Sequence, residues 1–327
     1  MLKNVFLLSA LSLTLGLLNA CGGVKHYKPP VGYVENVPDP FSIGQIIHLE
    51  SGKAVSFEQL IEQLGSEDLI FIGEVHNNPE HHLIQIQILQ ALSARYGPIT
   101  LAMESFSRAQ QSAVDQYVKG LTTEAILLDK LNWRKNWGFF YYYYRPFLLL
   151  AREKGLKVLA INADKAIAKK VARSGLKSLD DSQRSQIADS IDLSNSDHRS
   201  YVNEAYSHHA HKNLKNFEYF YQAQCVREDT MAENIAEFLK NSRTKMVVLT
   251  GNAHIINKYG IPDRTVKRVQ SNLATIVLYP LAGREIIRKR FGDYIWLTTV
   301  SPGRFASFVH GHNPGKSINP EKNPKQK

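Results

Sequence analysis

Cysteine is scarce in this chain of 327 residues, which has only Cys21 and Cys225. Two cysteines cannot build a disulfide framework, so the class of disulfide-stabilised scaffolds is excluded. Cys21 has a separate predicted role at the N-terminus, and Cys225 is then left without an intramolecular partner. We interpret Cys225 as a buried thiol and not as a nucleophile.

An apolar run long enough for a comfortable membrane span is also lacking. The N-terminal run, Val5 to Leu18, follows Lys3 and is too short for a span. A positive start followed by a short apolar core is typical of an export signal. The sequence therefore predicts a signal peptide over residues 1–20.

The end of this signal resembles a bacterial lipobox, with the residues Leu18-Asn19-Ala20-Cys21. In that interpretation Cys21 receives lipid and anchors the protein in the bacterial cell envelope. The residue after Cys21 is not Asp, which favours the outer membrane. A plain secretory signal cut at Ala20 and a short membrane anchor are the alternatives.

Acidic residues are fewer than basic ones, 30 against 40, and the formal net charge is +10. Such a balance favours anionic partners, either lipid headgroups or carboxylated small molecules. The basic residues are scattered apart from the C-terminal tail, and no nucleic-acid motif is present, so nucleic-acid binding is not expected. The hydrophobic content of 43% is that of an ordinary globular protein.

Composition divides the mature chain into three parts. Residues 21–40 carry Gly, Pro and Lys with little periodicity, and we interpret them as a tether between lipid and domain. Residues 41–301 hold the periodic apolar segments of one domain. Residues 302–327 form a basic tail rich in Lys, Pro and Asn, which is expected to be disordered.

Residues whose side chains can take part in catalysis or ligand binding follow a short apolar run at Leu69 to Ile72. The run ends at Gly73, Glu74 and His76 come next, and a helical pattern starts at Pro79 after the capping residue Asn78. An apolar run that ends in Gly before a helix predicts a buried strand and a βα turn. Ligands bind at such turns in parallel α/β sheets.

The same arrangement recurs at two later strands. The run from Ile99 to Met103 leads into Glu104, and the run from Lys245 to Thr250 leads into Gly251-Asn252-Ala253-His254. If the strands are parallel, Glu74, His76, Glu104 and His254 converge in one crevice. Two carboxylates and two imidazoles can bind a divalent metal or perform acid–base catalysis. Scattered polar groups that only satisfy loop backbone are the simpler alternative.

The order of the elements predicts an α/β fold with a mostly parallel central sheet flanked by helices. The polar, His-rich stretch from about 178 to 240 predicts a helical insertion over the strand ends. The last two strands, 274–279 and 294–299, lack a helix between them, and we expect an antiparallel edge there.

Aromatic residues gather between Trp133 and Phe147, where four tyrosines, 141–144, are consecutive. A helix spreads consecutive side chains by about 100°, so these four cannot all face one core. We expect part of the cluster to form a wall for a ligand or an interface.

These motifs together resemble the ChaN-like haem-binding lipoproteins of the Tiki/erythromycin-esterase-like superfamily. The resemblance covers about residues 41–301 and rests on the following segments: GEVHNNPEHH from Gly73, AMESF from Ala102, the aromatic region from Trp137 to Pro146, QCVREDTMA from Gln224, and GNAH from Gly251. It implies an α/β fold, haem binding and a part in bacterial iron uptake. It also implies haem held at a dimer interface with a tyrosine on iron.

The chemistry of ferric haem is consistent with that resemblance. A phenolate oxygen is an acceptable axial ligand to ferric iron, and basic residues can pair with propionates. We predict Tyr144 or Tyr221 as the iron ligand and Arg145 as a partner for the propionates.

The favoured interpretation is a haem-binding lipoprotein that is not an enzyme, forms a homodimer on binding haem, and works with an outer-membrane haem or iron receptor. The first alternative is an esterase or peptidase that uses metal or His-assisted chemistry. The wider superfamily includes hydrolases that use the motif positions, here Glu74, His76, Glu104 and His254. A surface lipoprotein with an inactive site is the second alternative.

Overall fold

The computed structural model describes residues 29–208 and 216–301. The predicted signal peptide, the predicted lipidation site Cys21 and the C-terminal tail lie outside these residues. A compact unit begins at Val31. Of the helices in the described ranges, none combines the length and apolar character that a membrane crossing requires.

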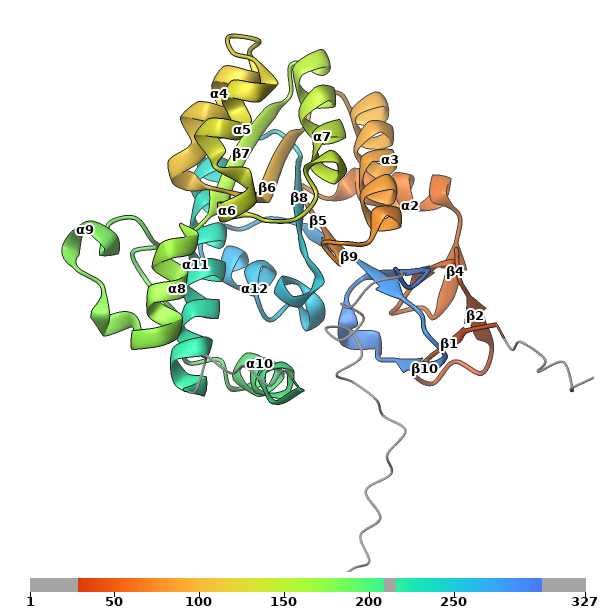
Figure 1. Ribbon diagram of the computed structural model, residues 1–327. Coiled ribbons are helices and arrows are strands. Elements are labelled where there is room, and N and C mark those ends of the chain that lie inside the picture. The colour runs from red at the N-terminus through yellow and green to blue at the C-terminus, as the bar shows by residue number, and fades with distance from the viewer. Residues whose placement is uncertain (1–28, 209–215, 302–327) are drawn as a thin grey trace, which may run out of the picture. The chain divides into compact units, whose positions relative to one another are not determined.

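Strands and helices alternate along most of the chain (Figure 1). The strands are β1 (Val31–Val34), β2 (Pro40–Ser42), β3 (Ile46–His48), β4 (Lys53–Val55), β5 (Leu69–Glu74), β6 (Thr100–Ser107), β7 (Lys157–Asn162), β8 (Met246–Gly251), β9 (Leu273–Pro280), β10 (Arg284–Ile287) and β11 (Tyr294–Thr298).

The α-helices are α2 (Phe57–Gln63), α3 (Pro79–Tyr96), α4 (Gln111–Val118), α5 (Glu124–Leu131), α6 (Trp133–Asn136), α7 (Tyr141–Lys154), α8 (Lys165–Ser174), α9 (Asp181–Arg184), α10 (Ser196–His208), α11 (Phe217–Asn241) and α12 (Ile261–Val266). The 3-10 turns are η1 (Leu64–Ser66), η2 (Arg108–Gln110), η3 (Leu176–Ser178), η4 (Asn252–His254), η5 (Ile256–Lys258) and η6 (Lys289–Phe291).

The main sheet has the strand order β4-β3-β11-β9-β5-β8-β6-β7, and the pairs from β11 to β7 are all parallel. This confirms the predicted α/β class with a mostly parallel sheet. Parallel strands in register place their carboxyl ends at one edge, and β5 and β8 pair up to Glu74 opposite Gly251. The strand-end motifs at Glu74 and Gly251 therefore lie side by side.

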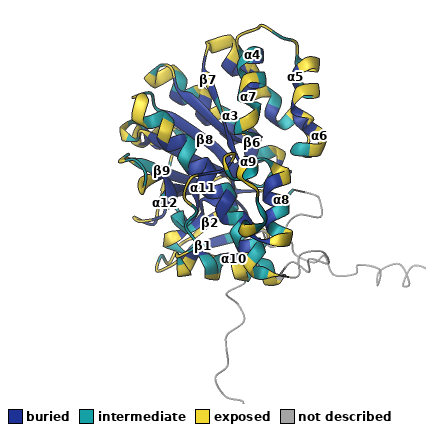
Figure 2. Ribbon diagram, turned by 90° about the vertical axis from the view of Figure 1, so that its left-hand side faces the viewer, coloured by how far each residue is buried: buried dark blue, intermediate teal, exposed yellow. Residues whose placement is uncertain are grey.

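Alternation along the buried strands divides the apolar core between the two faces of the sheet. Ile70 and Ile72 of β5 pack in one cluster with α3, α4 and α7. Leu69 and Phe71 of the same strand pack in a second cluster with α11 and α12. Figure 2 shows the buried sheet between helices whose outward faces are exposed.

The main sheet has an antiparallel edge, as expected, but β9 and β11 do not form it. β9 and β11 are parallel neighbours. The chain between them leaves the main sheet, because β10 pairs with β1 in a small separate sheet before η6 leads into β11. The antiparallel edge is made by β3 and β4, which come from the N-terminal part of the domain.

The predicted tether is too long at its C-terminal end. Val31–Val34 form β1, whose side chains alternate between half-buried and buried positions. A short strand paired on both sides, with β10 and β2, belongs to the domain. Four residues are too few to show a clear periodicity, so this strand was not predictable from the sequence.

Candidate active site

The turn after β5 is fixed by hydrogen bonds from its own helix. Asn78 caps α3 by accepting a hydrogen bond from the Glu80 amide at 3.0 Å, and Pro79 opens the helix. The Val75 amide donates to Nδ1 of His81 at 2.8 Å. Nδ1 of His81 is thus an acceptor, which a neutral imidazole can be, and burial lowers the pKa of His81 to about 3.

Glu74 is the most heavily contacted group of this turn. Its Oε1 lies 2.7 Å from Nδ1 of His76 and accepts a hydrogen bond from the Tyr144 hydroxyl at 2.8 Å. Its Oε2 lies 3.4 Å from Nδ1 of His82. Burial alone would raise the pKa of Glu74, but charge on His82 and hydrogen bonds from His76 and Tyr144 lower it to about 2. Glu74 is a buried carboxylate held in its ionised form.

Glu104 and His254 form the second pair. Oε2 of Glu104 accepts hydrogen bonds from the Thr250 hydroxyl and the Gly251 amide, both at 2.7 Å, so β8 positions the carboxylate on β6. Oε1 of Glu104 pairs with Arg227 and lies 3.3 Å from Nε2 of His254. Burial opposes ionisation, yet His254 and Arg227 hold the pKa of Glu104 well below its ordinary value.

The two pairs meet across Gly251. A Cβ atom at Gly251 would lie 3.0 Å from Nε2 of His76 and 3.7 Å from Oε2 of Glu104, so glycine allows both to approach the backbone. The structure thus brings Glu74, His76, Glu104 and His254 together at the carboxyl edge of the sheet. The side chains contact one another in two pairs, Glu74 with His76 and Glu104 with His254. Within the described ranges, no group of three His, Cys, Asp or Glu residues is arranged to hold a metal ion.

A third carboxylate, Glu228 of α11, completes the surroundings of His254. Its Oε1 lies 3.0 Å from Nδ1 of His254, so the imidazole lies between two carboxylates. Burial would lower the pKa of His254, but Glu104 and Glu228 raise it above the ordinary value. The two carboxylates on either side of His254 thus favour its protonated form.

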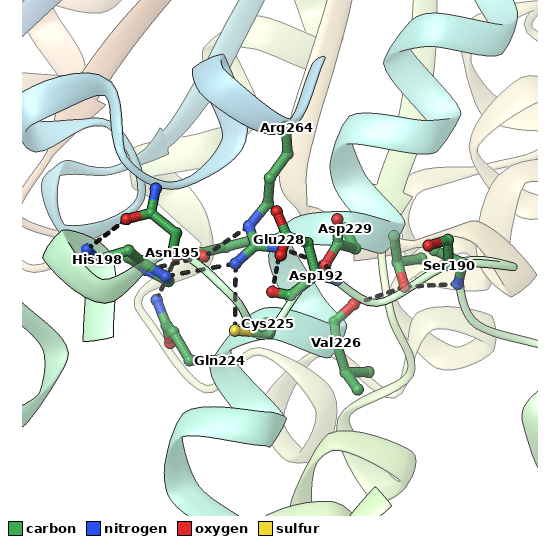
Figure 3. Close-up of polar contacts among 12 residues, drawn as sticks. Ser190, Asp192, Asn195, His198, Gln224, Cys225, Val226, Glu228, Asp229 and Arg264 are labelled. Atoms are coloured by element: carbon green, nitrogen blue, oxygen red, sulfur yellow. Dashed lines mark hydrogen bonds and ion pairs between the residues drawn. The ribbon is translucent and has the colours of Figure 1, made fainter. Parts of the chain in front are cut away.

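Glu228 is in turn anchored by a buried ionic network (Figure 3). Its Oε2 lies 3.1 Å from Nε2 of His198 and 3.3 Å from Nε of Arg264. Arg264, 1% exposed, also pairs with Asp229 and donates to Sγ of Cys225 at 3.1 Å. Burial raises the pKa of Cys225 to about 12, so this residue is a thiol, as its interpretation from sequence required.

Sequence reasoning missed Glu228, Gln224, His198 and Arg264 as parts of the site. The available signal was the run Arg227-Glu228-Asp229 in the middle of a long helix flanked by apolar residues. Charges are rarely fully buried unless they are paired, and such a run predicts partners from other elements. The pattern does not reveal that the partners come from α10 and α12.

A cavity of about 900 Å³ opens beside these residues, between α8, α11 and the aromatic segment before α7. Trp137, Phe139 and Phe220 supply aromatic wall, and His76 and Glu104 contribute polar groups. A smaller chamber of about 230 Å³ is lined by Glu74, His76 and His254. His76 borders both spaces, and His76 and Glu104 face the larger one, whose volume is within the usual range of small-molecule sites.

The predicted haem ligands lie away from this cavity. Tyr144 is 3% exposed, and its hydroxyl donates to Glu74. Burial and the Glu74 carboxylate raise the pKa of Tyr144 well above its ordinary value, which disfavours the phenolate. Tyr221 is fully buried, and its hydroxyl donates to the Asn195 carbonyl oxygen at 3.3 Å. Arg145 is bonded through Nε to both oxygens of Glu124, at 3.0 and 2.8 Å.

The pKa values of the turn predict a loss of stability in acid. Because Glu74 has a folded pKa of about 2 against an ordinary 4.5, its contribution is present above pH 4.5 and is lost as the pH falls towards 2. That difference corresponds to roughly 3 kcal/mol of unfolding free energy. His81 acts in the same direction from pH 6.5 downwards, since the unfolded chain binds its proton first.

Urea unfolding of the wild type and Glu74→Gln at pH 7, 4.5 and 3 measures this effect. Glu74→Gln should be less stable at pH 7 and should lose less stability than the wild type between pH 4.5 and 3. An equally steep loss in the variant would show that Glu74 does not carry the effect.

Comparison with known proteins gives a family and a fold. A family model described as haem-binding uptake, Tiki superfamily, ChaN matches residues 60–265. The solved structure of ChaN of Campylobacter jejuni, described as showing cofacial haem binding, matches with a TM-score of 0.61 and 19% identity over 77% of this chain and 95% of that one. An erythromycin esterase in its open conformation matches at a TM-score of 0.45 and 12% identity, over 72% of this chain and 76% of that chain. No curated protein matches.

Proposed function

This chain belongs to the haem-binding uptake family of the Tiki superfamily, the family of ChaN, and we propose that it binds ferric haem as a step in haem or iron uptake. The observation that carries the proposal is the cavity of about 900 Å³ beside the turn that follows β5, together with the family match. The volume lies within the range of about 300–1,000 Å³ that cofactor sites occupy.

The lining of the cavity suits the chemistry of haem, a flat apolar plate with two carboxylates at one edge. Trp137, Phe139 and Phe220 offer apolar aromatic surface to the plate. Ser105 and Asn162 line the same cavity, are 8% and 6% exposed, and each has a side-chain oxygen without a hydrogen-bond partner in the structure. These unpartnered oxygens suit a site that is completed by a ligand.

The segment that borders the cavity also has an exposed aromatic side. Phe140 and Tyr142 are 60% and 63% exposed, and their ring centroids are 5.2 Å apart. Exposed aromatic pairs mark interaction surfaces. We propose that a second copy of the chain covers this side when haem is bound, because two copies bury both faces of the plate and one copy leaves one face in water.

Titration with haem tests the function. The mature protein should shift the Soret band of ferric haem with micromolar or tighter affinity, and sedimentation velocity should show dimer in proportion to bound haem. Phe140→Ser, which removes exposed apolar area without touching the core, should weaken the dimer and leave the monomer folded. A flat titration in monomer and dimer fractions would exclude haem binding.

The intact acid–base groups support hydrolysis as the second candidate. Glu74 and His76 face the smaller chamber, and His254 lies between two carboxylates there. This arrangement can activate water towards an ester or an amide. Assays with a panel of ester and peptide substrates test this second candidate. Turnover that occurs without haem and is lost in His76→Ala would support a hydrolase. The absence of turnover with every substrate would reject it.

A further inference from the structure

One wall of the larger cavity is a row of cations on α8. Lys165, Lys169 and Arg173 are spaced four residues apart, and all three are exposed and line the cavity. Residues four apart share one face of a helix. Ala168 and Ala172, beside that row, also line the cavity, and their small side chains take up little of its volume. Ile167 and Val171 turn the opposite way and pack against α11.

This row is unfavourable for the helix itself. Like charges four residues apart on a helix repel each other. Lys165 lies in the first turn of α8, where a cation interacts unfavourably with the helix dipole. No acidic side chain in the described ranges forms an ion pair with Lys165, Lys169 or Arg173. Nζ of Lys165 donates to the Lys135 carbonyl oxygen at 3.0 Å. Burial and repulsion from Arg227 and Lys169 lower the pKa of Lys165.

The charge balance of the cavity is therefore positive. Arg227 is a fourth cation of the lining, and it is already paired with Glu104. The other carboxylate of the lining is Asp164, which caps α8 by accepting from the Ala166 amide at 2.7 Å. Among the described residues, Lys165, Lys169 and Arg173 have no anionic partner, and they line the same cavity as Trp137, Phe139 and Phe220.

We propose that Lys165, Lys169 and Arg173 form an anion-binding wall that takes the carboxylates of a flat aromatic ligand lying against Trp137, Phe139 and Phe220. The inference rests on the proposed haem function and assigns the propionate end of the ligand. It replaces Arg145, whose charge is neutralised by Glu124. Carboxylate and phosphate share the chemistry that recognises such a wall, and the aromatic surface beside it favours the carboxylated plate.

The test uses the mature chain and metal-free protoporphyrin IX, so that iron ligation plays no part. Fluorescence titration compares the wild type with a variant carrying Lys165→Gln, Lys169→Gln and Arg173→Gln. A control variant carries Lys119→Gln, Lys177→Gln and Lys240→Gln, which removes the same charge from exposed positions outside the cavity. The dimethyl ester of the porphyrin and inorganic phosphate are the comparison ligands.

The wall variant should bind protoporphyrin IX at least tenfold more weakly than the wild type and with less dependence on salt, and the control variant should change less than twofold. The dimethyl ester should bind the wild type and the wall variant alike. The thermal midpoint of the wall variant should stay the same or rise, because repulsion on α8 is removed, so weaker binding would not reflect unfolding.

The assignment would be overturned if the wall variant bound protoporphyrin IX as tightly as the wild type, or if the control variant lost as much affinity as the wall variant. Neither result would contradict haem binding itself. Tight binding of phosphate that excludes the porphyrin would assign the wall to a phosphorylated ligand and overturn the carboxylate. A wild type that binds neither haem nor protoporphyrin IX would reject the proposed function and the wall with it.

Discussion

Arg264→Met should lower the free energy of unfolding by about 3–5 kcal/mol, the cost of breaking a buried ion pair by removing one partner. Arg264 is 1% exposed and pairs with Glu228 and Asp229, which are both fully buried. Methionine fills much of the volume but leaves these two carboxylates short of a cation. Arg268 still bonds to Asp229 at 2.8 Å, and Glu228 still contacts His198 and His254, so the expected loss comes from removing the one guanidinium that both carboxylates share. Urea unfolding at pH 7 measures the loss.

The matched control is Arg95→Met, which breaks the exposed pair with Glu58. An exposed pair contributes about 0–1 kcal/mol, and the control should stay in that range. A loss below about 1 kcal/mol in Arg264→Met would contradict a stabilising network. Because Glu228 positions His254, the variant should also disturb the chamber next to the cavity, which the NMR signals of the His254 ring would report.

Tyr142→Phe should abolish the phenolate-to-iron charge-transfer band and weaken ferric haem binding by at least tenfold. We propose Tyr142 as the iron ligand because its side chain is 63% exposed and lies beside Phe140, on the side that a second copy would cover. Tyr142 does not line the cavity of its own copy, so it would reach haem at the interface between two copies. A tyrosine must reach the iron as phenolate, and an exposed hydroxyl can do this without breaking the core. Phenylalanine keeps the ring and removes only the oxygen.

Tyr144→Phe and Tyr221→Phe test the two ligands predicted from the sequence. Each should keep the charge-transfer band, since both hydroxyls are buried and donate within the protein. Tyr144→Phe should instead lower the free energy of unfolding by about 1 kcal/mol, because Glu74 loses the hydrogen bond from the Tyr144 hydroxyl. Loss of the band in either variant, with the band kept in Tyr142→Phe, would restore the sequence prediction.

The local signals in the sequence were sufficient for the elements that carry the site. Asn78 and Pro79 marked the start of α3, which begins at Pro79 as predicted. The apolar run from Leu69 predicted β5, and the run from Lys245 predicted β8 to within a residue. Helix caps, glycines and short apolar runs determine the conformation of only a few neighbouring residues, so they can be recognised in a single sequence.

The convergence of Glu74, Glu104 and His254 also followed from the sequence. Each lies at or shortly after the end of an apolar run, and parallel strands bring such positions to one edge whatever their order in the sheet. The order of the strands was not predictable, because β9 and β11 are joined through β10 in another sheet. The absence of a helix between these two strands did not predict whether they run parallel or antiparallel.

By itself, then, the sequence determined the α/β class, the strand ends that carry acid and base, and the resemblance to a haem-binding family, since these depend on local patterns and motifs. Tertiary structure alone decided which side chains are accessible. Of the consecutive tyrosines on α7, it buries Tyr144 against Glu74 and exposes Tyr142. It also brings Glu228 of α11 to Arg264 of α12 and aligns the cations of α8 with the cavity, because burial and pairing arise between elements distant in the chain.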